Sequence, residues 1–519
     1  MPAALLQFLG LPSELILECL VHLPYADMIS CLKTGNRLLH DIITNSVLIR
    51  YRVEEHRACV DENPAQTGNS VVADRLAALR RREDNWLNFT PVSRQTLVID
   101  FVTSGVYDLA SDIYLVGDTP DPNASLCTAI KYIYISPGVE APQWQSINAR
   151  KPVIDFGTAL EEHDLIAMVT YTPHDAIPDL ISIDVLLLKF STGLPHPLAA
   201  NPTLHIHNVE VQSGHPGISI EIVGENLAIS LVYWTDQQRD MDTLHIYNWN
   251  TGLPKMAPLE VNNTGVCFLT MDTLVVPNSE GSLDVYSIPL SEGCGLPRLI
   301  QSFYLPLLDP YHGVLSFQCR GDPNPRAAYT RPSRSRFLPR PDTALLFFTF
   351  EVVNRVGEVS EHMFIVDRPR LVGAIDARDL DVLSCHWDDW GPQCTRWLDA
   401  AAFSKNFITM TSGTRLAAIA VDAHLHPAPV RVLDFNPAHV RAQRAAGRHV
   451  VEADVEADAV AGTIEIPPFA EPIVSLLPYI ETVSKELFTY AAVLINDENI
   501  IGAKFGDGSV EALEVLHFG

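Results

Sequence analysis

The sequence predicts a multidomain chain in which a small all-α N-terminal part precedes a large all-β domain. Apolar residues follow a helical period only in about the first 90 residues. From Val92 onward, short runs of Val, Ile, Leu, Tyr and Phe alternate with turns rich in Pro, Gly, Asn and Asp, as strands do. Because 519 residues are too many for one ordinary core, we expect several units or one large repeat architecture.

The charge balance limits the partners of the chain. Lys and Arg number 36 against 63 Asp and Glu, which gives a net charge of −27. Such a chain repels phosphate backbones, so we expect no nucleic-acid partner. Apolar residues at 47% and charged residues at 19% are enough for a sizeable core.

The expected compartment is cytoplasmic and/or nuclear. Residues 1–9 are apolar but lack the basic start and cleavage site of a secretory signal. The longest apolar stretch, 344–353, is far shorter than the roughly 20 residues of a membrane helix, so no membrane partner is expected. Nine cysteines without a regular framework then indicate reduced thiols.

The first helical segment spans residues 13–23, with Ser13 placed to cap it and Pro24 to end it. Its apolar positions recur at three- and four-residue spacing: Leu15, Ile16, Cys19, Leu20 and Leu23. Two further helices are expected over 27–35 and 36–44. Because three such short helices bury little surface, their wide apolar face predicts a partner.

The stretch "LPSELILECLVHLPYADMISCLKTGNRLLHDII", residues 11–43, resembles an F-box. This resemblance implies a substrate receptor of a cullin–RING ubiquitin ligase that docks on the Skp-type adaptor. The positions that match the motif, and that the resemblance makes adaptor-binding, are Leu11, Pro12, Leu15, Ile16, Leu20, Leu23 and Pro24. The chain departs from the family at Thr34-Gly35, where Val-Cys is common, and at Leu38, where Trp is common. A plain helical hairpin packed on the rest of the chain is the alternative.

Two longer helical patterns follow, in "SVLIRYRVEEHRACVDENP" and "SVVADRLAALRRREDNWLNF". The second has one apolar side that also carries Glu83: Val72, Leu76, Leu79, Glu83 and Trp86. The pair resembles the helices after the F-box in a group of mushroom-type fungal F-box proteins, and its expected role is a rigid stalk. Glu83 and Asp84 directly follow Arg80, Arg81 and Arg82, which favours a solvated helix face over a nucleic-acid patch.

The β-rich part contains a recurring pattern. An apolar strand, a short turn and Gly-Leu-Pro occur together at residues 184–199, 243–258 and 282–299. Units of about 40 to 60 residues with a few strands each are typical of β-propeller blades. We therefore expect a six- or seven-bladed β-propeller, favour seven blades, and expect the C-terminal strands to help close the ring. A two-sheet sandwich array is the alternative.

Two insertions interrupt this pattern. Residues 320–341 hold six arginines among Pro and Ser, and we expect a mobile basic loop there, either simply solvated or used for docking a substrate. Residues 441–462 are basic and then acidic, which favours a plain solvated loop.

No sequence motif predicts catalysis, a metal or a cofactor. Cys385, His386 and Cys394 could be ligands, but no second ligand pair follows at short spacing, so a packed Trp-rich loop is favoured. The pairs His205/His207 and His424/His426 lack a third ligand nearby. We expect no catalytic residue, no metal and no cofactor.

The sequence therefore favours an adaptor with three parts: an F-box (1–50), a helical stalk (51–90) and a propeller-like substrate-binding domain (91–519). Its expected partners are the Skp-type adaptor, the cullin–RING ligase and an unknown protein substrate. Two alternatives stay open. One is a propeller enzyme in which carboxylates or histidines from several blades meet in the central channel. The other is a scaffold whose F-box no longer binds the adaptor.

Overall fold

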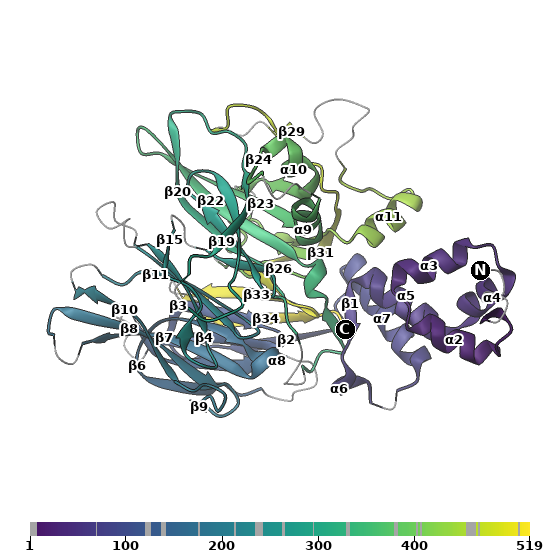
Figure 1. The fold of residues 1–519 in the computed structure, drawn as a ribbon, viewed down its shortest axis with the longest axis horizontal. Coiled ribbons are helices and arrows are strands. Elements are labelled where there is room, and N and C mark those ends of the chain that lie inside the picture. The colour runs from purple at the N-terminus through teal and green to yellow at the C-terminus, as the bar shows by residue number, and fades with distance from the viewer. Residues whose placement is uncertain are drawn as a thin grey trace.

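The computed structural model consists of a β-rich body and a helical arm that projects from one side of it (Figure 1). It describes residues 8–68, 70–119, 126–135, 142–174, 177–211, 214–233, 242–261, 265–293, 295–327, 333–377, 382–400, 403–404, 407–452, 463–464, 468–506 and 509–519. The N-terminal end of the arm is remote from the body, and the C-terminus lies where arm and body meet. Among these residues, no helix has both the length and the apolar character that crossing a membrane requires.

The arm contains most of the helical residues. Its helices are α2 (Ser13–Val21), α3 (Tyr25–Lys33), α4 (Arg37–Asn45), α5 (Val47–Ala58), α6 (Pro64–Thr67) and α7 (Val72–Leu87). Short helices within the body are α8 (Leu160–His163), η3 (Pro341–Thr343), α9 (Arg368–Asp376), α10 (Trp387–Cys394) and α11 (Pro437–Ala445).

The predicted helices are present, with shifted starts. Ser13 is the first helical residue of α2 rather than its cap, and Pro24 caps α3, which begins two residues earlier than expected. Asn36 caps α4 by accepting a hydrogen bond from the N–H of Leu39 at 3.1 Å. The helices α2 to α5 share one small core around Ile16, Leu20, Met28, Leu39, Ile43 and Ile49.

The body is built of antiparallel strands that mostly pair in chain order. One eight-stranded sheet contains β3 (Thr103–Ala110), β4 (Ile113–Asp118), β5 (Cys127–Tyr134), β6 (Gln145–Ala159), β7 (Leu165–Pro173), β8 (Leu180–Lys189), β9 (Leu194–Pro195) and β10 (Thr203–Glu210). The next two sheets are β11 (Gly217–Val223), β12 (Asn226–Val232), β13 (Thr243–Asn248), β14 (Leu253–Pro254) and β15 (Leu259–Glu260), then β16 (Cys267–Thr270), β17 (Thr273–Asn278), β18 (Ser282–Ser287), β19 (Arg298–Tyr304) and β24 (Ser384–Cys385).

Three four-stranded sheets follow. They are β20 (His312–Arg320), β22 (Leu345–Asn354), β23 (Val359–Asp367) and β25 (Thr395–Leu398); β26 (Thr411–Ser412), β27 (Arg415–Ala418), β28 (Ala428–Asp434) and β31 (Ile480–Phe488); and β32 (Ala492–Ile495), β33 (Asn499–Gly506), β34 (Ser509–His517) and β2 (Ser93–Val98). Two small pairs are β1 (Val60–Glu62) with β21 (Phe337–Pro339), and β29 (Thr463–Ile464) with β30 (Ile473–Val474). Because β2 pairs with the C-terminal β34, the first and last strands of the body close it, as predicted.

The Gly-Leu-Pro pattern marks equivalent places in successive sheets. Gly193 and Gly252 have φ of +67° and +77°, which glycine adopts readily. The following Leu-Pro pairs form β9 and β14, which return along β8 and β13 in the same register. The third occurrence follows β18, and the carbonyl of Gly295 accepts a hydrogen bond from the N–H of Ala257 at 3.0 Å. The recurrence in the sequence therefore reflects a repeated structural unit with adjoining loops.

The arm is fixed to the body by α7, whose predicted side is buried at Leu76, Leu79, Glu83 and Trp86. The Trp86 ring stacks on Phe518, with centroids 4.1 Å apart. Asn85 Nδ2 donates to the carbonyl oxygen of Phe518 at 2.8 Å. These contacts hold α7 against the body.

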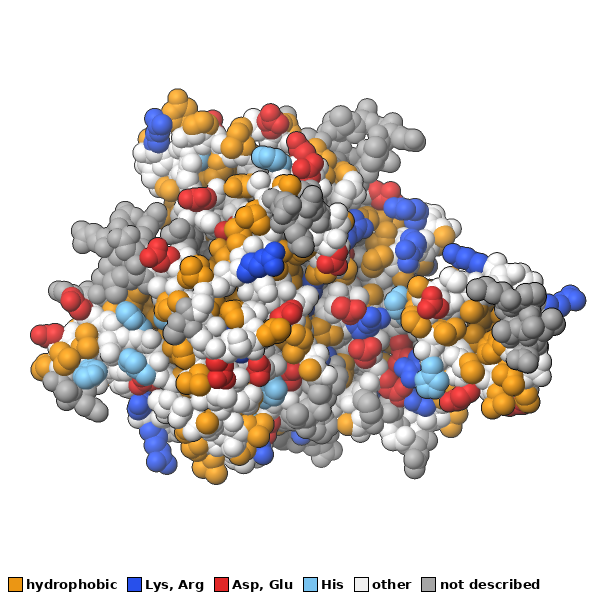
Figure 2. Space-filling model, in the orientation of Figure 1, with side chains coloured by type: hydrophobic (Ala, Val, Ile, Leu, Met, Phe, Trp, Pro, Cys, Tyr) orange, Lys and Arg blue, Asp and Glu red, His pale blue; other side chains and the backbone are white. Residues whose placement is uncertain are grey.

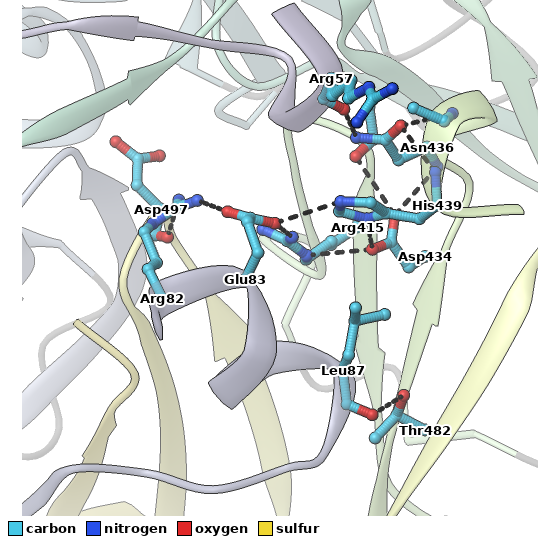
Figure 3. Close-up of polar contacts among 12 residues, drawn as sticks. Arg57, Arg82, Glu83, Leu87, Arg415, Asp434, Asn436, His439, Thr482 and Asp497 are labelled. Carbon is cyan, nitrogen blue, oxygen red and sulfur yellow. Dashed lines mark hydrogen bonds and ion pairs between the residues drawn. The ribbon is translucent and has the colours of Figure 1, made fainter. Parts of the chain in front are cut away.

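A buried cluster of charges completes this joint (Figure 3). The Glu83 carboxylate pairs with the guanidinium groups of Arg82 and Arg415, and His439 Nε2 lies 3.6 Å from it. His439 Nδ1 lies 2.8 Å from Asp434 Oδ2. Arg82 is only 2% exposed, which corrects the expectation that the whole arginine run is solvated.

The segment 320–341 also differs from its prediction as a mobile loop. Its strand β21 pairs with β1 of the arm. The side-chain amide of Asn63 donates to the carbonyl oxygens of Ser333 and Ser335 at 2.8 and 2.7 Å. Most of its described arginines pair with acidic side chains. Arg340, for example, bonds Asp342 at 2.7 Å. The segment therefore fastens the arm to the body, apart from residues 328–332, which lie outside the described part.

Candidate functional site

A cavity of about 320 Å³ lies where the first strands of several sheets meet. Its wall is formed by β3, β6, β11, β20, β26 and residues next to β32, with the segment 322–326. Neighbouring strands approach closely there: a Cβ at Gly157 of β6 would lie 3.0 Å from the carbonyl oxygen of Ile220 in β11. The cavity is therefore a feature of the centre of the body, and its wall combines residues far apart in the chain.

One buried arginine organises the polar groups of this cavity. Arg320, at the end of β20, donates to Asp108 of β3 at 2.5 Å and to Asp322 at 2.6 Å. Thr158 of β6 donates its hydroxyl hydrogen to the other oxygen of Asp108 at 2.8 Å. These bonds connect two sheets across the cavity and satisfy the guanidinium with two carboxylates.

Three further carboxyl groups face the same cavity, and each accepts a hydrogen bond from an uncharged donor. Asp155 of β6 accepts a hydrogen bond from the N–H of Phe156 at 2.8 Å, and Glu221 of β11 accepts one from Asn324 Nδ2 at 2.5 Å. Asp497, after β32, accepts one from the Ser412 hydroxyl at 3.0 Å. Burial raises the pKa of each of these three carboxyl groups to about 7. No ion pair holds any of the three among the residues that the structure describes.

The rim of the cavity carries a second set of pairs. Arg326 pairs with Glu161, and both oxygens of Glu162 accept backbone N–H groups, from Ala327 at 3.0 Å and from Gly224 at 2.9 Å. The carbonyl oxygen of the Asn324 side chain is buried and has no hydrogen-bond donor within the described residues. The rim thus fixes segment 322–326 over the cavity and leaves the Asn324 oxygen without a donor among the described residues.

The predicted adaptor-binding residues divide into two groups in the arm. Ile16 and Leu20 are 0% and 1% exposed, and the small bundle itself covers their side chains. The exposed members lie on the surface of the arm: Leu11, Pro12, Leu15, Leu23 and Pro24. Leu15 is 52% exposed, and Leu38 of α4 is exposed as well. Figure 2 shows apolar side chains gathered at this outer end of the molecule.

The other candidate sites of the sequence have structural roles. Cys385 and Cys394 are buried with Trp390 in an aromatic core, and the expected Trp-rich loop is the helix α10. His205 contacts Asp184 at 2.9 Å on the exposed side of its sheet. Within the described residues, no group of three or more His, Cys, Asp or Glu side chains is arranged to hold a metal ion.

Sequence reasoning missed the cavity residues. Each of the central acidic residues interrupts an apolar strand, as in "VYDLA", "VIDFG" and "ISIEIV". A carboxyl group within such a strand is costly to bury unless it has partners or lines a cavity, so this was the available signal. The strands alone did not show that these residues meet.

Comparisons with known proteins add little beyond this geometry. No family model and no curated protein matches the chain. The WD40 domain of SCAP from fission yeast is similar over 79% of this chain and 82% of its own, at 8% identity and a TM-score of 0.32. The WD40 β-propeller domain of Doa1 is similar over 82% and 97%, at 9% identity and a TM-score of 0.32. At such scores, the strand pairings above remain the basis for describing the fold.

Proposed function

We propose that this chain is the substrate-recognition subunit of an SCF-type ubiquitin ligase. In this proposal the arm is an F-box that binds a Skp-type adaptor, and the body holds a protein substrate. The observation that carries the proposal is the set of exposed apolar residues on the arm, led by Leu11, Leu15 and Leu23, on a bundle whose own core is already filled by Ile16 and Leu20. Exposed apolar groups gathered on so small a unit are typical of a docking surface.

The sheets of the body support seven blades in this proposal. The long strand β6 pairs with β5 through Gln145–Asn148 and Val153, and with β7 through Val153–Ala159, so its two halves serve two four-stranded units that meet at Val153. Dividing the eight-stranded sheet there leaves seven units in chain order, of which the last is closed by β2. Seven blades of four strands are within the range of β-propellers.

The firm attachment of the arm to the body also supports the receptor proposal. A substrate receptor contributes proximity and orientation, and the chemistry is done by its ligase partners. The buried Glu83 cluster and the Trp86–Phe518 stack hold the arm in one position on the body. A bound substrate would therefore keep a defined position relative to the adaptor.

A second candidate function, a central-channel enzyme, is favoured by the carboxyl groups in the cavity. Asp155 and Glu221 come from different sheets, and both have a pKa near 7, which suits general acid–base chemistry. The described wall contains no Ser–His or Cys–His pair, so a nucleophilic mechanism has no candidate residues there. Screening the purified protein for hydrolase and lyase activity, with Asp155→Asn as the control, tests this candidate.

Co-purification with the Skp-type adaptor tests the receptor proposal. We expect the wild-type chain to retain the adaptor and Leu15→Glu to lose it, because Leu15 is exposed and its replacement leaves the bundle core intact. Leu425→Glu is the matched control, since it changes an exposed leucine of the body. Retention of the adaptor by Leu15→Glu in a folded protein would refute the proposed surface. Failure of the wild-type chain to bind would favour the scaffold alternative.

A further inference from the structure

The central cavity has an excess of negative charge that its own cations do not neutralise. Seven carboxyl groups and two guanidinium groups line it. Arg320 is engaged by Asp108 and Asp322, and Arg326 is engaged by Glu161. Both cations of the wall are therefore already paired with carboxylates.

Several acceptors of the wall have no cation to pair with. Asp155, Glu221 and Asp497 have hydrogen-bond donors from the protein but no cation within ion-pair distance in the described part of the chain. Figure 3 shows the Asp497 carboxylate directed away from Arg82, whose guanidinium instead bonds the backbone oxygen of Asp497 at 2.6 Å. The buried Asn324 Oδ1 adds an acceptor without a donor. Such buried acceptors are costly unless water, a proton or a ligand satisfies them, and a ligand with hydrogen-bond donors can do so.

The dimensions of the cavity limit the size of its ligand. A volume of about 320 Å³ is at the lower end of the range of small-molecule sites, so it suits a small molecule or one long side chain rather than a folded domain. A phosphate or a carboxylate would meet the excess of negative charge. A ligand with several N–H donors and a positive charge would instead match both the charge and the free acceptors.

We propose that the central cavity binds an organic cation of the guanidinium or ammonium type, in the region bounded by Asp155, Glu221 and Asn324. The cation is either a free small molecule or the basic side chain of a substrate protein. The second source names the substrate class of the receptor and rests on the function proposed above. The preference of the cavity for a cation does not rest on it.

Isothermal titration of the full chain tests this site with three probes. Agmatine represents a free cation, acetyl-Gly-Arg-Gly-amide represents a basic side chain, and the same peptide with citrulline replaces the guanidinium by a neutral group of similar shape. We expect at least one cationic probe to bind and the citrulline peptide to bind at least tenfold more weakly. Binding of agmatine alone identifies a small-molecule site, and binding of the arginine peptide identifies a protein side chain.

Two isosteric variants locate the binding. Glu221→Gln and Asp155→Asn remove one charge each without changing the volume of the wall, and each is expected to weaken cation binding about tenfold. Glu280→Gln, which changes an exposed carboxylate on the β17–β18 turn, is the matched control and should bind as the wild type does. Thermal unfolding checks that each variant is folded. If one variant does not fold, cation binding by the other variant decides the test.

The inference is overturned if neither cation binds, if the citrulline peptide binds equally well, or if both folded variants bind like the wild type. Co-purification with the Skp-type adaptor is measured on the same samples. Loss of adaptor binding with intact cation binding would refute the receptor and leave the site standing. Intact adaptor binding without cation binding would refute the cation site and leave the receptor proposal standing.

Discussion

Removing the carboxylate of Glu83 is expected to loosen the arm from the body. In Glu83→Ala, the guanidinium groups of Arg82 and Arg415, 2% and 7% exposed, lose their shared partner. Breaking a buried pair from one side costs about 3–5 kcal/mol. Arg415 keeps Asp434, with its Nε 3.4 Å from Oδ2, and Arg82 keeps the carbonyl of Asp497, so we expect about 3 kcal/mol, the lower end.

Hydrogen exchange measured by mass spectrometry is the appropriate assay, because it reports the opening of α7 itself. A cost of about 3 kcal/mol raises the opening equilibrium roughly 150-fold, so peptides from α7 should exchange faster by about that factor. Glu486→Ala is the matched control, since it breaks an exposed pair with Arg94 whose expected value is under about 1 kcal/mol. If α7 exchanges equally fast in Glu83→Ala and in this control, the buried cluster does not hold the arm.

Two more predictions concern the same joint. Its neighbours hold the pKa of Glu83 below the usual 4.5 and the pKa of His439 above the usual 6.5. The contribution of Glu83 is lost as the pH falls through its lowered pKa, and that of His439 is lost as the pH rises through its raised pKa. Protection of α7 should therefore be greatest between about pH 5 and 6.5, and an equal level at pH 8 would contradict this. Trp86→Ala removes a buried ring stacked on Phe518 and should cost about 3–5 kcal/mol in calorimetric unfolding, whereas the exposed Val98→Ala should change stability by less than about 0.5 kcal/mol. Equal calorimetric effects of these two variants would show that the stack is unimportant.

Much of the architecture could be predicted because its signals are local. The helical period of residues 13–23 and the apolar side of α7 follow from side-chain spacing alone. The hairpin between β17 and β18 turns at Gly281, whose φ of +88° is one that glycine adopts readily. In each case the neighbours in sequence are also the neighbours in space.

The predictions that were wrong concern residues whose partners are remote in the sequence. Arg82 belongs to an arginine run that looks solvated, yet it is buried because Glu83 and the body together compensate its charge. The segment 320–341 looks like a free basic loop because its partners are remote in sequence: Asn63 lies 270 residues from Ser333. Polar partners at such distances leave no periodic pattern, so composition alone suggested a solvated or mobile segment.

By itself, the sequence determined the division into a helical arm and a β-rich body and the repeated Gly-Leu-Pro unit, since each depends on patterns within tens of residues. The closure of the body depends instead on the pairing of β2 with β34, which lie at opposite ends of its sequence. Only the tertiary structure decided where the first strands of the sheets converge. Asp108, Asp155, Glu221 and Arg320 come from four strands spread over more than 200 residues, and they share one cavity because the sheets are arranged around it. The excess charge of that cavity is a sum over remote side chains, and so it exists only in the folded chain.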